Sequence, residues 1–107
     1  MRSQILKYSD TQILRYSDTQ ILDYVMEKIK AAIVENELPA IENLQRMIQT
    51  YCPVVELAGT YQTYDKALEG IQKGKPQLVF LDIDLGVKSG FDLLKPLKHL
   101  YFEVIFT

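Results

Sequence analysis

The sequence predicts an α/β protein with a doubly wound parallel sheet whose helices cover both faces. Four short apolar segments suited to buried strands begin at Ile29, Val54, Leu78 and Val104, and segments with helical spacing of apolar residues separate them. Parallel strands need crossover connections of this kind, whereas antiparallel strands can be joined by tight turns. The alternation of strands and helices therefore indicates a parallel sheet with right-handed crossovers.

The first strand and the first helix are predicted at the start of the domain. Ile29–Val34 is an apolar run that ends at an acidic cluster, as expected of a strand buried on both faces. Pro39 follows at a place where a first helical turn tolerates proline. Apolar residues then recur at helical spacing as far as Ile48, and Pro53 ends the helix.

The next strand and helix are predicted from turn and capping residues as well as from apolar spacing. Val54–Ala58 is expected to form the second strand, which Gly59 closes. Thr63 is a suitable N-cap for a helix that runs to about Gln72. Gly74 then acts as a stop signal for that helix.

The third strand is the clearest single element. Leu78–Leu81 is fully apolar and predicts a buried strand that ends at Asp82. A loop leads to Gly90, and a helix is expected over residues 91–99. Val104–Thr107 begins the fourth predicted strand, and the sequence stops there.

The first 27 residues differ from the rest because they repeat an eight-residue unit. QILKYSDT at Gln4–Thr11 recurs as QILRYSDT at Gln12–Thr19 and decays to QILDYVME at Gln20–Glu27. Eight residues advance an α-helix by about 800°, so the Ile-Leu pairs form no single apolar seam. We therefore predict a weakly structured N-terminal extension over residues 1–27, with a helical or strand-like arm as the alternative, and one domain over residues 28–107.

Length, charge and composition exclude several classes of function. A chain of 107 residues fits one small domain, and its net charge of −2 gives no reason to expect nucleic-acid binding by this segment. No apolar run reaches the roughly 18–20 residues that span a bilayer. Cys52 is the lone cysteine and lacks metal-type spacing to other ligands, which indicates a reducing, cytoplasmic compartment.

Oxygen-bearing side chains follow the first and third predicted strands. Glu35 and Asn36 come directly after the first strand, and Asp82 and Asp84 follow the third. In a doubly wound sheet, ligands bind outside the carboxyl ends of the strands, near the point where the strand order reverses. The sequence therefore places a candidate site where these two segments meet.

Two segments resemble the receiver domains of two-component response regulators. LVFLDIDLGVKSGFDLL at Leu78–Leu94 has the receiver pattern of an apolar strand, an aspartate, a short loop ending in a small residue and glycine, and an amphipathic helix. IKAAIVENELPA at Ile29–Ala40 is similar to the matching first strand and acidic cluster. The resemblance covers residues 28–107 and is strongest to receivers that precede LytTR-type DNA-binding domains. It implies a flavodoxin-like fold with strand order 2-1-3-4-5, incomplete at the C-terminus after strand four.

The resemblance also implies a role for individual residues. Asp82 matches the phosphoacceptor, which receives a phosphoryl group from a sensor histidine kinase. Glu35 and Asn36 match the pair that holds a magnesium ion together with Asp82, and Asp84 matches the residue whose backbone carbonyl also binds the metal. Gly90 matches the glycine that turns the loop into the following helix. The implied protein is a phosphoprotein that controls an output domain, transcriptional in type, and is not an enzyme.

Two departures from the family pattern open alternatives. The usual metal-binding pair is two carboxylates, so Asn36 removes one negative charge, and we expect weaker magnesium binding. The catalytic Lys of the family lies beyond strand four and is missing here. Both departures favour a rival function, a pseudo-receiver that serves as an interaction module without phosphorylation. A small α/β enzyme with Asp82 as base is the second rival, but a second catalytic group for it is lacking.

The end of the sequence at Thr107 has a structural consequence of its own. Without a fifth strand, Val104, Ile105 and Phe106 would form an apolar edge, and exposed edges invite pairing with another chain. We therefore expect a homodimer or a domain-swapped oligomer through this strand. DNA would be reached only through an output domain that the sequence does not contain.

Overall fold

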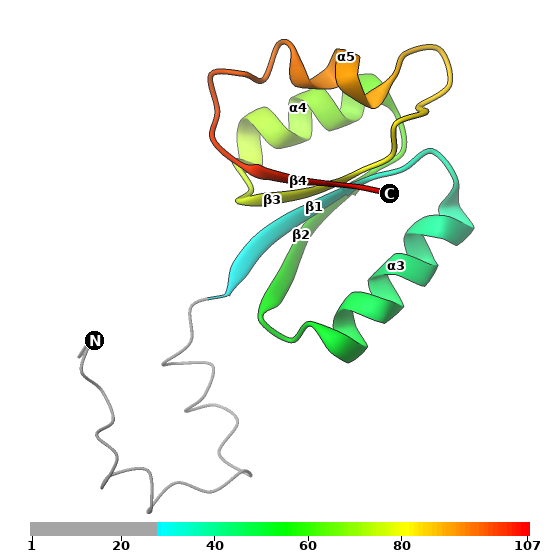
Figure 1. Ribbon diagram of the computed structural model, residues 1–107, viewed down its shortest axis with the longest axis vertical. Helices are drawn as coiled ribbons and strands as arrows, with labels where there is room; N and C mark the ends of the chain where they lie inside the picture. Colours follow the sequence, from blue (N-terminus) through cyan, green and yellow to red (C-terminus); the bar gives the residue numbers. More distant parts are fainter. Residues whose placement is uncertain (1–27) are drawn as a thin grey trace, which may run out of the picture.

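A computed structural model describes residues 28–107 of the chain (Figure 1). The octad repeats of residues 1–27, and the domain boundary that we place after them, lie outside the described residues. The described elements, in chain order, are β1 (Ile29–Val34), α3 (Leu38–Tyr51), β2 (Val55–Tyr61), α4 (Tyr64–Gly74), β3 (Leu78–Leu81), α5 (Gly90–Leu94) and β4 (Glu103–Phe106).

The four described strands form one parallel sheet in the order β2-β1-β3-β4. β1 lies between β2 and β3, so the sheet grows in opposite directions from its first strand, as a doubly wound fold requires. In the register of the three strands, Val34 of β1 is opposite both Tyr61 of β2 and Leu81 of β3. The predicted fold class is confirmed, and the carboxyl ends of β1 and β3 lie side by side.

Helices cover both faces of the sheet and define two apolar cores. Figure 1 shows α3 on one side of the sheet and α4 and α5 on the other. The core under α3 is formed by Ala31, Ile33, Ile41, Ile48 and Phe80. The core under α4 and α5 is formed by Val34, Ala67, Ile71, Val79, Leu81, Leu85, Leu93 and Leu97. Within residues 28–107, no helix combines the length and the apolar character needed to cross a bilayer.

β2 is longer than predicted, because Gly59 does not end it. Ala31 of β1 is opposite Leu57, whereas Ala32 is opposite Gly59, so Ala58 is an extra residue that bulges out of the ladder. The strand then continues to Tyr61. A Cβ on Gly59 would overlap the Tyr61 ring, so glycine here makes room for that aromatic side chain.

The helix predicted over residues 91–99 is wrong in length, since α5 ends at Leu94. Pro96 has no backbone N–H and cannot make the next helical hydrogen bond. The chain instead proceeds by tighter turns, in which the Leu97 N–H donates to Leu94 O at 3.2 Å and the Leu100 N–H donates to Leu97 O at 2.9 Å. Leu97 still reaches the core and is only 1% exposed, so its apolar position was read correctly but its helical conformation was not.

The N-cap prediction for α4 is confirmed. The Thr63 side chain accepts a hydrogen bond from the Lys66 N–H at 3.2 Å. At the other end, Lys75 takes a left-handed conformation with φ of 48°, and its N–H donates to Ile71 O. α4 therefore runs two residues past the predicted end at Gln72, to Gly74.

β4 forms an outer strand with apolar surface, one residue earlier than predicted. Val104 packs against the core under α4 and α5, whereas Ile105 and Phe106 are 48% and 44% exposed. The Phe106 ring lies 5.2 Å from the ring of Phe91 at the start of α5. The exposed apolar edge is present as expected, and pairing with a second copy stays a prediction.

Candidate functional site at the ends of β1 and β3

The site begins where two parallel strands end side by side. Val34 and Leu81 are the last residues of β1 and β3 and are register partners. The Asp82 N–H donates to Val34 O at 2.9 Å, which extends the ladder by one residue. Glu35 and Asp82, which are 47 positions apart in sequence, therefore leave the sheet at adjacent points on its rim.

The carboxyl groups of Glu35 and Asp82 interact with each other. Burial raises the pKa of Glu35, and the charge of Asp82 and a hydrogen bond with its side chain raise it further. The Glu37 N–H, which donates to Glu35 Oε2 at 3.0 Å, acts in the opposite direction by stabilising the carboxylate. The net result is a raised pKa of Glu35, with burial as the largest cause and the neighbouring Asp82 side chain as a further one.

The loop after Asp82 is held by its own backbone and by one apolar anchor. Asp82 Oδ1 accepts the Asp84 N–H at 3.1 Å, and Asp84 Oδ1 accepts the Gly86 N–H at 2.9 Å. Gly86 has φ of 90°, a conformation that glycine adopts without strain. Leu85 enters the core under α4 and α5 and is 7% exposed. The Asp84 carboxylate is thus turned toward its own loop.

Gly90 closes this loop against the phosphoacceptor candidate. Its N–H donates to Ile83 O at 2.6 Å. A Cβ at residue 90 would lie 2.5 Å from the carbonyl oxygen of Asp82 and 3.0 Å from Leu81 Cγ. Only a residue without a side chain fits so near the backbone of Asp82, which gives a physical reason for the glycine that the sequence pattern placed here.

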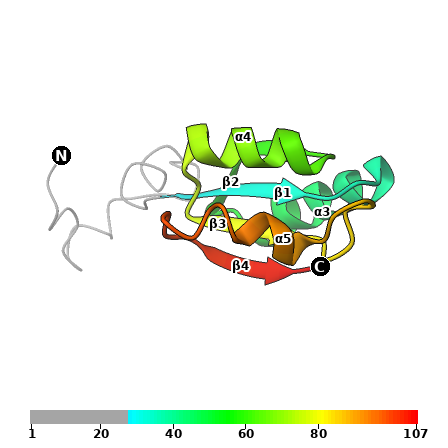
Figure 2. The ribbon, with the colours of Figure 1, turned by 90° about the horizontal axis from the view of Figure 1, so that it is seen from above.

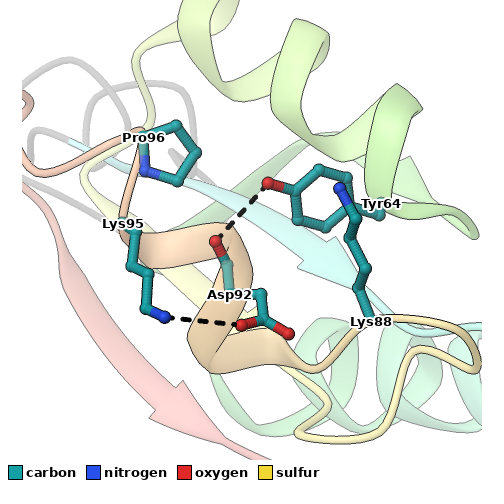
Figure 3. A pocket seen from close by; sticks show the side chains of 5 residues that line it. All are labelled: Tyr64, Lys88, Asp92, Lys95 and Pro96. Atoms are coloured by element: carbon teal, nitrogen blue, oxygen red, sulfur yellow. Dashed lines mark hydrogen bonds and ion pairs between the residues drawn. The ribbon is translucent and has the colours of Figure 1, made fainter.

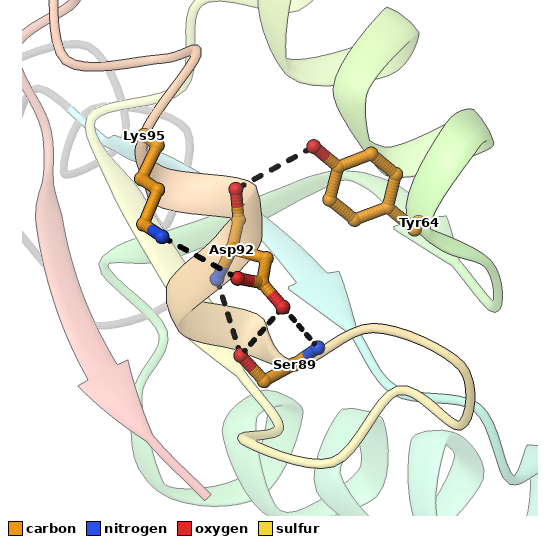
Figure 4. A network of polar contacts seen from close by, with 4 residues as sticks. All are labelled: Tyr64, Ser89, Asp92 and Lys95. Atoms are coloured by element: carbon orange, nitrogen blue, oxygen red, sulfur yellow. Dashed lines mark hydrogen bonds and ion pairs between the residues drawn. The ribbon is translucent and has the colours of Figure 1, made fainter.

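α5 begins with a reciprocal capping box, shown in Figure 4. The Asp92 N–H donates to Ser89 Oγ at 3.2 Å, and the Ser89 N–H donates to Asp92 Oδ2 at 3.0 Å. That backbone donor lowers the pKa of the Asp92 carboxyl, and the Ser89 hydroxyl and Lys95 act in the same direction. A Ser-x-x-Asp pattern ahead of an apolar pair was the available signal, which the sequence analysis did not use.

The remaining members of the predicted metal site lie on the same rim. Asn36 is exposed and follows Glu35 directly; its backbone carbonyl accepts from Gln62 Nε2 at 3.3 Å. Asp84 is two residues beyond Asp82, in the loop just described. The structure brings the side chains of Glu35 and Asp82 together, and the assignment of all four residues to a metal stays a prediction.

The donor chemistry of this rim fits magnesium. Residues 28–107 contain no group of three or more His, Cys, Asp or Glu side chains arranged to hold a metal. The predicted set instead combines two carboxylates with an amide and a backbone carbonyl. Magnesium prefers oxygen ligands and keeps several waters, so a few protein oxygens suffice. Burial is the largest cause of the raised pKa of Glu35, and the nearby charge of Asp82, which a bound cation would offset, adds to it.

We expect the Glu35→Gln variant to be more stable than the wild-type chain in metal-free buffer at neutral pH. Because folding raises the pKa of Glu35, its favourable contribution is complete below the usual value of 4.5 and is lost as the pH rises through the folded-state pKa. Glutamine keeps an acceptor for the Glu37 N–H without the charge. Urea unfolding in EDTA should show a gain of about 0.2–1 kcal/mol, the range of solvent-screened pairs.

The gain in the Glu35→Gln variant should vanish when the same unfolding curves are measured below the usual glutamate pKa, where both chains carry a neutral group. A variant that is equally stable at neutral pH, or one whose gain does not depend on pH, would show that folding does not raise the pKa of Glu35.

Comparison with proteins of known sequence relates this part of the chain to proteins named sensory transduction protein LytT. The LytT protein of Bacillus anthracis is 33% identical over 72 residues, which are 67% of this chain and 29% of that protein. The LytT protein of Enterococcus faecalis is 38% identical over 68 residues, 64% of this chain and 28% of that protein. The chain therefore spans less than a third of these relatives. No family model matches it.

Solved structures show the same architecture. The receiver domain of the PhyR response regulator from Erythrobacter litoralis is 31% identical, with a TM-score of 0.66 over 76% of this chain and 63% of that domain. The response regulator domain of Thermotoga maritima CheB is 21% identical, with a TM-score of 0.68 over 75% of this chain and 60% of that one. The strand order, the position of Asp82 at the end of β3 and both comparisons agree: the chain belongs with the receiver domains of response regulators.

Proposed function

We propose that Asp82 accepts a phosphoryl group from the phosphohistidine of a sensor kinase, and that the chain thereby carries a signal to an output domain. The single observation that supports this most is the contact between Asp82 and Glu35 across the ends of β1 and β3. These two acids are far apart in sequence, yet they meet at the rim where doubly wound sheets bind ligands. An aspartate that served only as a solvated loop residue would gain nothing from a second carboxyl group beside it.

The proposed step is a direct displacement at phosphorus. An oxygen of the Asp82 carboxylate attacks the phosphoryl group, the P–N bond to the donor breaks, and an acyl phosphate forms. The donor nitrogen leaves with the electron pair of that bond and takes up a proton from solvent. Such a reaction needs positioning and charge stabilisation more than covalent assistance from the protein, and the Asp84 N–H already orients one oxygen of Asp82.

The residues that would hold magnesium are Glu35, Asp82 and Asn36 through their side chains and Asp84 through its carbonyl. When bound there, magnesium offsets the repulsion between the attacking carboxylate and the phosphoryl oxygens. Glu35 would bind through its carboxylate, and Asn36 would supply an amide oxygen without charge. The neutral amide predicts weaker cation binding than a second carboxylate would give.

The wider system is proposed from the relatives. Proteins named sensory transduction proteins match this chain over less than a third of their length, so an output module, here a transcriptional one, would lie outside the matched part. The chain acts as a switch for that module and not as an enzyme. A cytoplasmic kinase domain is the proposed partner, and pairing through the exposed strand β4 is the proposed route to a dimer.

A phosphorylation-independent pseudo-receiver is the second candidate, and one observation favours it. Asn36 stands where the family pattern has a carboxylate, and the described residues offer no third acidic side chain to the cation. In that case the same fold would serve as a docking module whose state does not depend on phosphate. The experiment below separates the two functions.

The test is to incubate the chain with phosphoramidate and magnesium and to measure its intact mass. We expect one added phosphoryl group, which disappears when EDTA is present. Borohydride reduction followed by peptide mapping should convert residue 82 to homoserine, because an acyl phosphate is reduced and a free carboxylate is not. A chain that takes up no phosphoryl group at any magnesium concentration would favour the pseudo-receiver.

A further inference from the structure

A tyrosine at the start of α4 contacts both the loop that follows Asp82 and helix α5. An open pocket of about 610 Å³ lies between these elements. Its lining residues are Tyr64, Lys88, Asp92, Lys95 and Pro96 (Figure 3). The Lys88 ammonium lies 4.1 Å from the centre of the Tyr64 ring. The Tyr64 hydroxyl donates to the backbone carbonyl of Asp92 at 3.4 Å.

The carbonyl that Tyr64 reaches is left open by the sequence of α5. In a continuing helix, the carbonyl of Asp92 would accept from the N–H of residue 96, four positions on. Residue 96 is proline and has no N–H to donate. Figure 4 shows the Tyr64 hydroxyl pointing at this carbonyl from α4, so one side chain supplies the donor that the helix lacks.

The ring of Tyr64 makes a second contact, with the loop that carries Asp84. Lys88 is six residues beyond Asp82 by number, and its own carbonyl accepts the Leu85 N–H at 3.1 Å. Asp84 and Ser89 form an isolated β-bridge, which ties the two ends of the loop together. These bonds link the backbone of Lys88 to the backbone around Asp84, so a displacement of one is passed to the other.

Lys88 has no carboxylate within ion-pair distance among residues 28–107, so its contact with the Tyr64 ring is the attraction that locates its charge. An ammonium over an aromatic face is held by the ring quadrupole, and the contact is directional because the face is negative and the edge is not. The side chain of Tyr64 is partly buried against the core under α4 and α5, so it provides a fixed platform.

We propose that Tyr64 is a positioning residue for the phosphoacceptor loop: its ring holds Lys88, its hydroxyl holds Asp92, and together these contacts fix the loop that presents Asp82 and the Asp84 carbonyl. The effect of this positioning on function rests on the proposed function, since a loosened loop matters only if a cation and a phosphoryl group bind there. The contact itself involves neither of the predicted carboxylate ligands.

The test compares Tyr64→Leu with two conservative variants. Tyr64→Leu removes the platform without a change in charge, whereas Tyr64→Phe keeps the ring and Lys88→Arg keeps a cation over it. We expect Tyr64→Leu to speed hydrogen exchange of the Asp84 amide in metal-free chain by about two- to five-fold, as loss of an exposed cation–π contact allows. Half-saturating magnesium should rise by a similar factor. Lys88→Arg should behave as wild type, and Tyr64→Phe should lose less than Tyr64→Leu.

Lys88→Met provides a second route if Tyr64→Leu fails to fold, because Lys88 is exposed. Loss of its charge alone would tighten magnesium binding, whereas loss of positioning would weaken it. At about 1 M salt the Debye length is about 3 Å, so the charge effect is largely screened. There we expect Lys88→Met to bind magnesium about two- to five-fold more weakly than wild type. Equal or tighter binding would overturn the positioning role.

Tyr101→Leu is the matched control, because Tyr101 is 88% exposed and, within residues 28–107, forms no hydrogen bond or ring contact with the loop. It should leave both amide exchange at Asp84 and magnesium binding unchanged. If the wild-type chain binds no magnesium and takes no phosphoryl group, the proposed function fails and the positioning role fails with it. If wild type does both and Tyr64→Leu matches it in exchange and in binding, only the positioning role is refuted.

Discussion

We expect the Asp82→Asn variant to take up no phosphoryl group under conditions that phosphorylate the wild-type chain. Asparagine is nearly the same size and keeps the carbonyl oxygen that accepts the Asp84 N–H, so the loop should retain its shape. What disappears is the anionic oxygen that attacks phosphorus. The expected effect is therefore complete loss of the adduct by intact mass, with an unchanged circular dichroism spectrum and unfolding midpoint.

Asp65→Asn is the matched control for this experiment. Asp65 is an exposed residue in the first turn of α4, and Asp65→Asn makes the same chemical change at a carboxylate that is not among the predicted site residues. That variant should be phosphorylated as the wild-type chain is. An Asp82→Asn protein that still gains a phosphoryl group at the wild-type rate would mean that another side chain is the acceptor, and the assignment of Asp82 would be wrong.

The Gly90→Ala variant is expected to lose both stability and the geometry of the site. The new Cβ would lie 2.5 Å from the Asp82 carbonyl oxygen and 3.0 Å from Leu81 Cγ. The first of these neighbours is backbone and cannot swing aside as a flexible side chain could. Overpacking of this kind costs about 1–3 kcal/mol, which urea unfolding should show as a lower free energy of unfolding. Because the strain falls on the backbone of Asp82, phosphorylation should slow as well.

Gly74→Ala shows what the same substitution does without the clash. A Cβ on Gly74, the last residue of α4, would meet no atom within 4 Å. Among the described glycines only Gly86 has a positive φ, so the backbone of Gly74 is in a conformation that alanine can adopt. Alanine there should raise the free energy of unfolding by about 0.4–1 kcal/mol, by restricting the unfolded chain. A Gly90→Ala protein that gained stability as Gly74→Ala does would contradict the close approach.

The sheet could be predicted well because its strands are nearly pure apolar runs with clear boundaries. Ile29–Val34 and Leu78–Leu81 have the predicted bounds, each ending at an acidic residue that leaves the core. β2 was harder to delimit, because Gly59 is a common terminator and a bulge at Ala58 keeps the strand going. A bulge depends on the neighbouring strand, so the apolar pattern of one segment does not contain it.

The candidate site could be predicted in part for a similar reason. Parallel strands bring their carboxyl ends together, so the sequence alone predicts that Glu35 and Asp82 meet. The contact of Tyr64 with Lys88 could not be predicted in this way. It joins the start of α4 to the loop before α5, and their relative position depends on how α4 and α5 pack. The short length of α5 was missed because the apolar spacing continues to Leu97 after Pro96 has ended the helix.

The most direct test of the shared cation pocket is a titration of the isotope-labelled chain with Mn²⁺, a paramagnetic stand-in for magnesium, followed by NMR. Amide signals of Glu35, Asp82 and Asp84 should broaden first, and excess Mg²⁺ should restore them. Broadening that begins instead at the exposed acid Glu69 of α4, or that leaves residues 35 and 82 untouched, would show that the ends of β1 and β3 do not hold a divalent cation.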